Sequence, residues 1–195
     1  MIRRQPQLVG HCGPCSVVMM LGELGYECTQ ERLSTAAGVS TTIALEGSRL
    51  DQLRSGVLQV SQNVDLLLRY RCDLQVLRDV LALGLSVGVE WQCTFQDPSR
   101  GLFSTGHFAV VVGISDDKVE LVDPDDNSIY CAGSIAQADF LSRWWEDNTF
   151  DGGEIVRSFG AAFVLVHGGD SRLRSLVHWG FKPATYDYVR VGGSP

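Results

Sequence analysis

The chain has 195 residues, of which 45% are hydrophobic and 20% charged, and its formal net charge at pH 7 is −7. This length suits one domain with a substantial core, and the negative charge argues against nucleic acid or an anionic membrane as the main partner. No apolar run approaches the ~20 residues that span a bilayer, and we see no apolar segment of a signal peptide. The six cysteines are scattered, as is usual in a reducing compartment. We therefore expect a soluble, cytoplasmic protein without a membrane span; its oligomeric state is not indicated.

The first predicted element is a helix that begins at or next to Cys12. Gly13 and Pro14 mark its first turn, where the missing N–H of a proline does no harm. Apolar residues then recur at helical spacing, which predicts one buried face: Val17, Val18, Met20, Leu21 and Leu24. The free N–H groups and the dipole at a helix N-terminus stabilise a thiolate. Cys12 is therefore a candidate nucleophile.

A glutamine stands five residues before this cysteine, at Gln7. Its side-chain amide is a suitable hydrogen-bond donor for the oxyanion that forms when a thiolate attacks a carbonyl. Gln5 is also near, and the five-residue spacing favours Gln7.

Several short helices and one strand are predicted next. Thr29 is an N-cap for a helix that ends near Ala37, and residues 41–47 are small and polar, which predicts a loop. Ser48 is the expected cap of a second amphipathic helix, and Asp73 caps a third that stops at Gly84. The leucine-rich residues 64–70 are interpreted as a strand.

Residues 85–91 (LSVGVEW) predict a buried strand, and residues 92–105 are interpreted as a loop because they contain Asp97-Pro98 and glycines. This segment leads directly to His107. It is interpreted either as a border of the functional site or as a solvated connector.

Two further strands, residues 107–115 and 118–122, are separated by a turn at Asp116-Asp117. In such a hairpin the start of the first strand lies beside the end of the second. His107 and Asp123 are therefore expected to be neighbours. Acyl transfer by a thiol needs an imidazole that exchanges a proton and a group that orients the imidazole, and these two residues supply both.

The motifs Gln-x4-Cys-Gly-Pro, Gly-His-Phe before a valine-rich strand, and Asp-Pro sixteen residues after the histidine resemble those of the bacteriocin-processing peptidases. That family belongs to the papain-like clan and includes peptidases that cleave leaders after double glycines. The resemblance covers residues 2–167. It implies a papain-like α+β fold, in which an N-terminal helical lobe packs on a central antiparallel sheet.

The resemblance also implies roles: Cys12 as nucleophile, His107 as general base and acid, Asp123 as the orienting residue and Gln7 as oxyanion donor. The expected reaction is hydrolysis of a peptide bond, including that of a leader peptide. An acyl- or peptidyl-transferase with the same triad is the alternative. The expected partner is a peptide or acyl-carrying substrate, and we expect no cofactor and no metal.

The segment Cys12-Gly-Pro-Cys15 suggests a second hypothesis, because this spacing is the redox motif of thioredoxins. A thioredoxin motif follows a long buried strand, which the preceding residues do not resemble. We therefore interpret Cys15 as a small buried residue on the helix. A dithiol oxidoreductase remains the least favoured function.

The C-terminal part predicts a turn at residues 125–127 in place of a calcium loop, a helix over residues 134–145 and a last sheet strand over residues 161–167. Residues 168–195 form an extension to the domain of residues 1–167, either packed on it or partly flexible. Within the extension we expect a helix that ends near Trp179 and an edge strand over residues 186–191.

Overall fold

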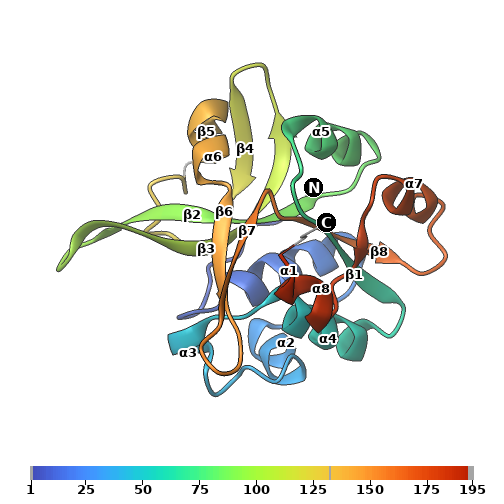
Figure 1. Ribbon diagram of the computed structural model, residues 1–195, viewed down its shortest axis with the longest axis horizontal. Coiled ribbons are helices and arrows are strands. Elements are labelled where there is room, and N and C mark those ends of the chain that lie inside the picture. Colours follow the sequence, from blue (N-terminus) through green and yellow to red (C-terminus); the bar gives the residue numbers. More distant parts are fainter. Residues whose placement is uncertain (1, 132, 193–195) are drawn as a thin grey trace.

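A seven-stranded antiparallel sheet forms the centre of the molecule within residues 2–131 and 133–192, the part that the computed structural model describes (Figure 1). Its strand order is β5-β4-β3-β2-β8-β1-β9, and β6 and β7 form a separate hairpin. The strands are β1 (Val64–Arg69), β2 (Val87–Asp97), β3 (Gly101–Ile114), β4 (Lys118–Val122), β5 (Ser134–Ala136), β6 (Trp145–Thr149), β7 (Ile155–Phe159), β8 (Ala162–His167) and β9 (Lys182–Pro183). The helices are α1 (Cys12–Glu23), α2 (Gln30–Ala36), α3 (Ile43–Glu46), α4 (Leu50–Ser61), α5 (Leu74–Ala82), α6 (Gln137–Arg143), α7 (Leu173–His178) and α8 (Tyr186–Arg190).

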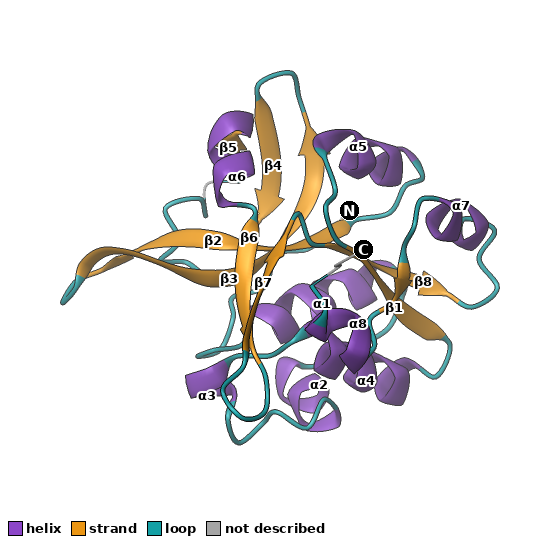
Figure 2. Cartoon of the chain, in the orientation of Figure 1, coloured by secondary structure: helices purple, strands orange, loops and turns teal. Residues whose placement is uncertain are grey.

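Helices cover both faces of the sheet (Figure 2). Side chains of α1 and α4 share one hydrophobic core with Phe108 and Phe163 of the sheet. On the other face, side chains of α5, α6 and α7 pack with Trp91 and Val111. Successive residues of a strand point to opposite faces, so the central strands supply apolar side chains to both cores. The predicted α+β architecture, with N-terminal helices packed on a central antiparallel sheet, is confirmed. None of the described helices combines the length and the apolar character that a bilayer crossing requires.

Most predicted helix starts are correct, and one cap is wrong. Thr29 Oγ1 accepts a hydrogen bond from the Arg32 N–H at the start of α2, and Asp73 does the same for Val76 at the start of α5. In contrast, Arg49 occupies the N-cap position of α4, where its N–H donates to the Gln52 side chain. Ser48 lies outside the helix with a buried hydroxyl that has no hydrogen-bond partner among the described residues. The predicted loop at residues 41–47 contains the short helix α3.

The predicted loop at residues 92–105 is wrong, because β2 and β3 continue as a long hairpin that extends from the body of the molecule (Figure 1). Phe95 pairs with Phe103 across the hairpin, and their rings stack with centroids 5.5 Å apart. Such cross-strand aromatic pairs stabilise a ladder. The Asp97-Pro98 step marks only the tip, where Asp97 Oδ1 accepts hydrogen bonds from the N–H groups of Ser99 and Arg100.

Two C-terminal predictions also need correction. Residues 134–145 do not form one helix, since the segment is divided among β5, α6 and the start of β6. The predicted edge strand at residues 186–191 is helix α8, which Thr185 caps by accepting a hydrogen bond from the Tyr188 N–H. The edge strand is instead β9, which pairs with β1. Residues of this C-terminal segment enter both cores, namely Leu176, Phe181, Ala184 and Val189; residues 193–195 lie outside the described part of the chain.

Candidate active site

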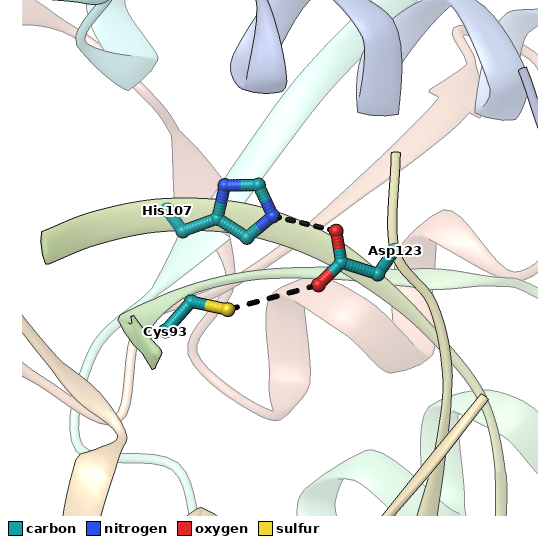
Figure 3. A group of neighbouring side chains, drawn as sticks. All are labelled: Cys93, His107 and Asp123. Atoms are coloured by element: carbon teal, nitrogen blue, oxygen red, sulfur yellow. Dashed lines mark hydrogen bonds and ion pairs between the residues drawn. The ribbon is translucent and has the colours of Figure 1, made fainter. Parts of the chain in front are cut away.

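The hairpin of β3 and β4 brings His107 and Asp123 together as the sequence predicted. The turn closes with a hydrogen bond from the Ser115 N–H to the Lys118 carbonyl, and Asp123 directly follows β4. His107 Nε2 lies 2.8 Å from Asp123 Oδ1 (Figure 3), and both side chains are almost completely buried. A carboxylate at this distance accepts the Nε2 proton, so it fixes the orientation of the ring and leaves Nδ1 as the free nitrogen.

Asp123 is itself held by several donors. Its Oδ1 accepts a second hydrogen bond from the Asp125 N–H at 2.9 Å, and Cys93 Sγ lies 3.8 Å from Oδ2 (Figure 3). Ser128 Oγ lies 3.2 Å from the same sulfur. Although burial raises the pKa of Asp123, the hydrogen bond and the charge of His107 outweigh it and lower the pKa below its usual value. The carboxylate is therefore ionised at neutral pH.

Cys12 is the first residue of α1, next to His107. The helix packs closely against the rest of the chain there: a Cβ on Gly13 would lie 2.5 Å from Ser48 Oγ and 3.3 Å from the Phe108 ring. Burial alone lowers the pKa of His107, but hydrogen bonding to Asp123 and Cys12 and the charges of both groups raise it above the usual histidine range. An imidazole beside the thiol is the arrangement that activation of a cysteine requires.

Gln7 lies against the loop that follows Asp123. Its backbone N–H donates to the Pro124 carbonyl at 2.9 Å, and its Nε2 donates to Asp125 Oδ2 at 2.8 Å. Arg4 Nε donates to the backbone carbonyl of Asp123 at 2.7 Å. The N-terminal segment is thereby fixed beside the His107–Asp123 pair. Gln5 was the alternative candidate for the oxyanion donor. Its backbone carbonyl accepts a hydrogen bond from the thiol of Cys15.

The other cysteines differ strongly in exposure. Cys15 is fully buried on α1, and burial, followed by the charge of Cys12, raises its pKa to about 12. Cys93 is also fully buried, and burial raises its pKa well above the usual range. Cys131 is exposed and Cys28 half-buried. The burial of Cys15 agrees with its interpretation as a packing residue.

One group of described residues could in principle hold a metal ion. Ligand atoms of Cys93, His107 and Asp123 lie within 4.8 Å of one another, and all three side chains are buried. A thiol, an imidazole and a carboxylate are the ligands that zinc prefers. Here, however, each is already engaged in the hydrogen bonds around the Asp123 carboxylate.

Two groups of polar residues around this site were not predicted from the sequence. Cys93 and Ser128 carried no local signal, since small residues of this kind are common in any core. Glu90 did carry one, because a charged residue inside an apolar strand is rarely buried without a reason. It is 1% exposed, and its pKa is raised well above the usual range by burial and by the neighbouring charge of Glu146. Glu146 lies on β6, and burial raises its pKa to about 7.

The fold of this chain is similar to that of several solved structures. No family model matches the sequence, and no curated protein does. Among solved structures, the chain is similar to a protein from Bacillus anthracis described as a C39-like peptidase, with a TM-score of 0.58 and 15% identity over 87% of this chain and 96% of that one. It is also similar to the peptidase domain of Streptococcus ComA, a bi-functional ABC transporter of a quorum-sensing pathway, with a TM-score of 0.55 and 14% identity over 86% and 99% of the two chains.

A third similar structure is a double glycine motif protease from an AMS/PCAT transporter in complex with the leader peptide. Its TM-score is 0.52, with 15% identity over 85% of this chain and 91% of that one. At these identities the likeness concerns the fold. The chain therefore has the papain-like α+β fold of the C39 peptidases.

Proposed function

We propose that this protein is a cysteine peptidase in which Cys12 is the nucleophile, His107 the general base and acid, and Asp123 the residue that orients His107. The observation that carries the proposal is the buried His107–Asp123 hydrogen bond beside the N-terminal residue of α1, which is Cys12. The fold supports it, because three similar structures are described as peptidases of this kind.

The contacts suggest how the reaction proceeds. The Cys12 thiolate attacks the carbonyl carbon of the scissile bond, and the His107 imidazolium then donates its proton to the departing amine. A thioester remains on Cys12. His107 next removes a proton from water, the hydroxide attacks the thioester, and the acid product leaves with the thiolate restored. Asp123 keeps the imidazole in one orientation throughout.

Gln7 is the proposed donor to the oxyanion of each tetrahedral intermediate. An amide NH2 group has two hydrogens, and Asp125 Oδ2 accepts only one of those on Gln7 Nε2. The second hydrogen is available for the oxyanion. The bond to Asp125 also restricts the rotation of the amide, which favours a preorganised donor.

The proposed substrate is a peptide, and a leader peptide is the more specific suggestion. It is supported by the third similar structure, which is described as a complex with the leader peptide. Transfer of the acyl group to an amine uses the same triad, since only the acceptor differs. Mass spectrometry of the products, with and without an added amine, distinguishes hydrolysis from transfer.

Alkylation by iodoacetamide near neutral pH tests the nucleophile. We expect Cys12 to be labelled first, although Cys131 is more exposed, because the neighbouring His107 can accept the proton of the thiol. Cys131 thus serves as an internal control for simple access. Equal labelling of Cys15, or labelling of Cys12 that is unchanged in His107→Ala, would contradict the proposal.

A pair of variants separates acyl transfer from dithiol redox chemistry. Cys15→Ala should retain most peptidase activity, with a loss of ~1 kcal/mol or more in stability from poorer packing. Gln7→Ala should slow acyl transfer by ~10²-fold or more. A dithiol oxidoreductase would respond in the opposite way, because the second thiol resolves the mixed disulfide. Both variants should be assayed on an activated peptide ester and on a small disulfide.

A further inference from the structure

The glycine immediately before His107 is covered by a carboxylate from a distant part of the chain. Gly106 is paired with Gln92 in the β2–β3 ladder, and a Cβ on Gly106 would overlap both carboxylate oxygens of Glu146. Glu146 belongs to β6, in the separate β6–β7 hairpin that crosses the central sheet in Figure 1. The carboxylate therefore occupies the space that a side chain would take at the residue before His107.

The contacts of this carboxylate fix it in place. Gln92 Nε2 donates to Glu146 Oε2 at 3.2 Å, and the Asp147 N–H donates to Oε1 at 3.0 Å. The backbone N–H of His107 also lies close enough to Glu146 to lower its pKa, against the larger opposing effect of burial. The carboxylate thus contacts both strands of the β2–β3 hairpin and the backbone of Gly106 and His107.

The hairpin that carries Glu146 is itself held firmly. Arg157 of β7 donates two hydrogen bonds of 2.7 Å to the two carboxylate oxygens of Asp147, and its guanidinium lies 4.3 Å from the ring centroid of Trp145. These three residues are paired or adjacent across β6 and β7. Glu146 is therefore carried by a paired strand whose neighbouring side chains contact one another across the hairpin.

Because successive side chains of β3 point to opposite faces, the contact of Glu146 with Gly106 lies on the face opposite the His107 imidazole. His107 is paired with Trp91, and its ring lies perpendicular to that of Phe95 with the centroids 5.1 Å apart, whereas its neighbour Gly106 faces the other side of the strand. Because the two residues are adjacent, a shift of the Gly106 backbone also changes the orientation of the His107 side chain. Small displacements of this kind have large effects, because a misplacement of about 1 Å in a catalytic group can reduce a rate by about 10²-fold.

We propose that Glu146 is a positioning residue, whose carboxylate holds the Gly106–His107 backbone from the face opposite the imidazole and so sets the His107 ring against Cys12 and Asp123. The proposal rests on the proposed function for its effect on turnover. The contact itself and its effect on the ring do not depend on that function.

A double-mutant cycle tests the contact. Gly106→Ala alone should reduce peptide turnover by about 10- to 100-fold, because the new methyl group and the carboxylate cannot share the same space. In Gly106→Ala with Glu146→Ala, turnover should return to the level of Glu146→Ala alone. A double variant as impaired as Gly106→Ala would overturn the proposal. Glu154→Ala is the matched control, since this acid lies at the same hairpin but pairs with Arg190 at the surface.

A second measurement keeps the proposal testable if Gly106→Ala fails to fold or no peptidase activity is found. NMR of ¹⁵N-labelled histidine reports the ring nitrogens and the titration of His107 directly. In Glu146→Ala the His107 signals should shift and titrate differently, Glu146→Gln should lie closer to the wild type, and Glu154→Ala should match it. Unchanged His107 signals in Glu146→Ala would overturn the positioning role, whereas changed signals without turnover in any variant would contradict only the proposed peptidase.

Discussion

The two faces of the β2–β3 hairpin bury acidic groups in opposite ways. On the face of His107, the Asp123 carboxylate receives hydrogen bonds from the imidazole and from a backbone N–H. On the other face, neither oxygen of Glu90 makes a hydrogen bond of normal geometry to a described residue, although the Asn148 amide lies close enough to oppose the rise in its pKa. The surroundings of Asp123 thus favour its ionised form, and those of Glu90 favour its protonated form.

This difference shows what hydrogen-bond partners contribute at equal burial. Burial raises the pKa of both carboxyl groups, and only the donors around Asp123 reverse that effect. A neutral Glu90 is the form that a buried site without donors stabilises. The ionised group can assist proton transfer at His107, whereas the neutral group affects mainly the dependence of stability on pH.

Removal of the imidazole should give the largest effect on the His107 face. His107→Ala should reduce turnover of a peptide substrate by about 10³-fold or more, because it removes the group that we propose as general base and acid. Steady-state kinetics on a peptide substrate measure this. His167→Ala is a control, since that ring packs on Tyr26 away from the pair. Equal activity of the two variants would contradict the role of His107.

Removal of the Asp123 carboxylate should have the next largest effect. Asp123→Ala should reduce turnover by about 10²-fold, and it should lower the pKa of His107, which the hydrogen bond and charge of Asp123 raise. The alkaline limit of activity should therefore shift to lower pH. Asp123→Asn, which keeps an acceptor oxygen, should lie between Ala and the wild type. A pH–rate profile that is identical in all three proteins would argue against this role.

Replacement of the neutral acid on the other face should change the slope of stability against pH. Folded Glu90 keeps its proton above the pH at which the unfolded chain releases it, since its folded pKa is raised. Between the unfolded and the folded pKa of this group, the folded protein should therefore lose stability as the pH rises, by at most about 1.4 kcal/mol per pH unit. Glu90→Gln should remove that slope.

Urea unfolding of the wild type and Glu90→Gln at pH 6, 7 and 8 measures this effect. Glu154→Gln serves as the control, because its carboxylate is at the surface in an ion pair with Arg190. Wild-type and Glu90→Gln stabilities that change in parallel with pH would show that Glu90 is not held neutral.

The smallest expected effect is on stability and concerns Ser128, which contacts Asp123 through Cys93. Ser128→Ala removes the hydroxyl that contacts Cys93 and accepts a hydrogen bond from the Tyr130 N–H. It should lower stability by about 1 kcal/mol, as is typical for a lost buried hydrogen bond. Denaturant unfolding measures it. Ser99→Ala, at the exposed tip of the β2–β3 hairpin, should change stability less, and a larger loss there would contradict the comparison.

Features set by neighbouring residues could be predicted from the sequence. Asp73 caps α5 through an N–H three residues away, and the turn after β3 closes the hairpin that brings His107 to Asp123. The start of α1 at Cys12 follows from Gly13-Pro14 and the helical spacing of the apolar residues behind it. Each of these depends on hydrogen bonds or periodicity within a short segment, which sequence patterns record directly.

Features that depend on packing between distant segments could not be predicted from the sequence. Residues 92–105 form part of the sheet, where Phe95 bridges to the distant Ser128. Residues 186–190 are helical and place Val189 in the core that it shares with α1 and α4. Packing between distant segments also sets the position of Glu146 over Gly106. It likewise decides which carboxyl groups meet hydrogen-bond donors, so the pKa of Asp123 is lowered and that of Glu90 is raised. The sequence by itself determined which residues could carry the chemistry and how His107 meets Asp123. Only the tertiary structure decided what surrounds them, because desolvation and close packing depend on segments far apart in the chain.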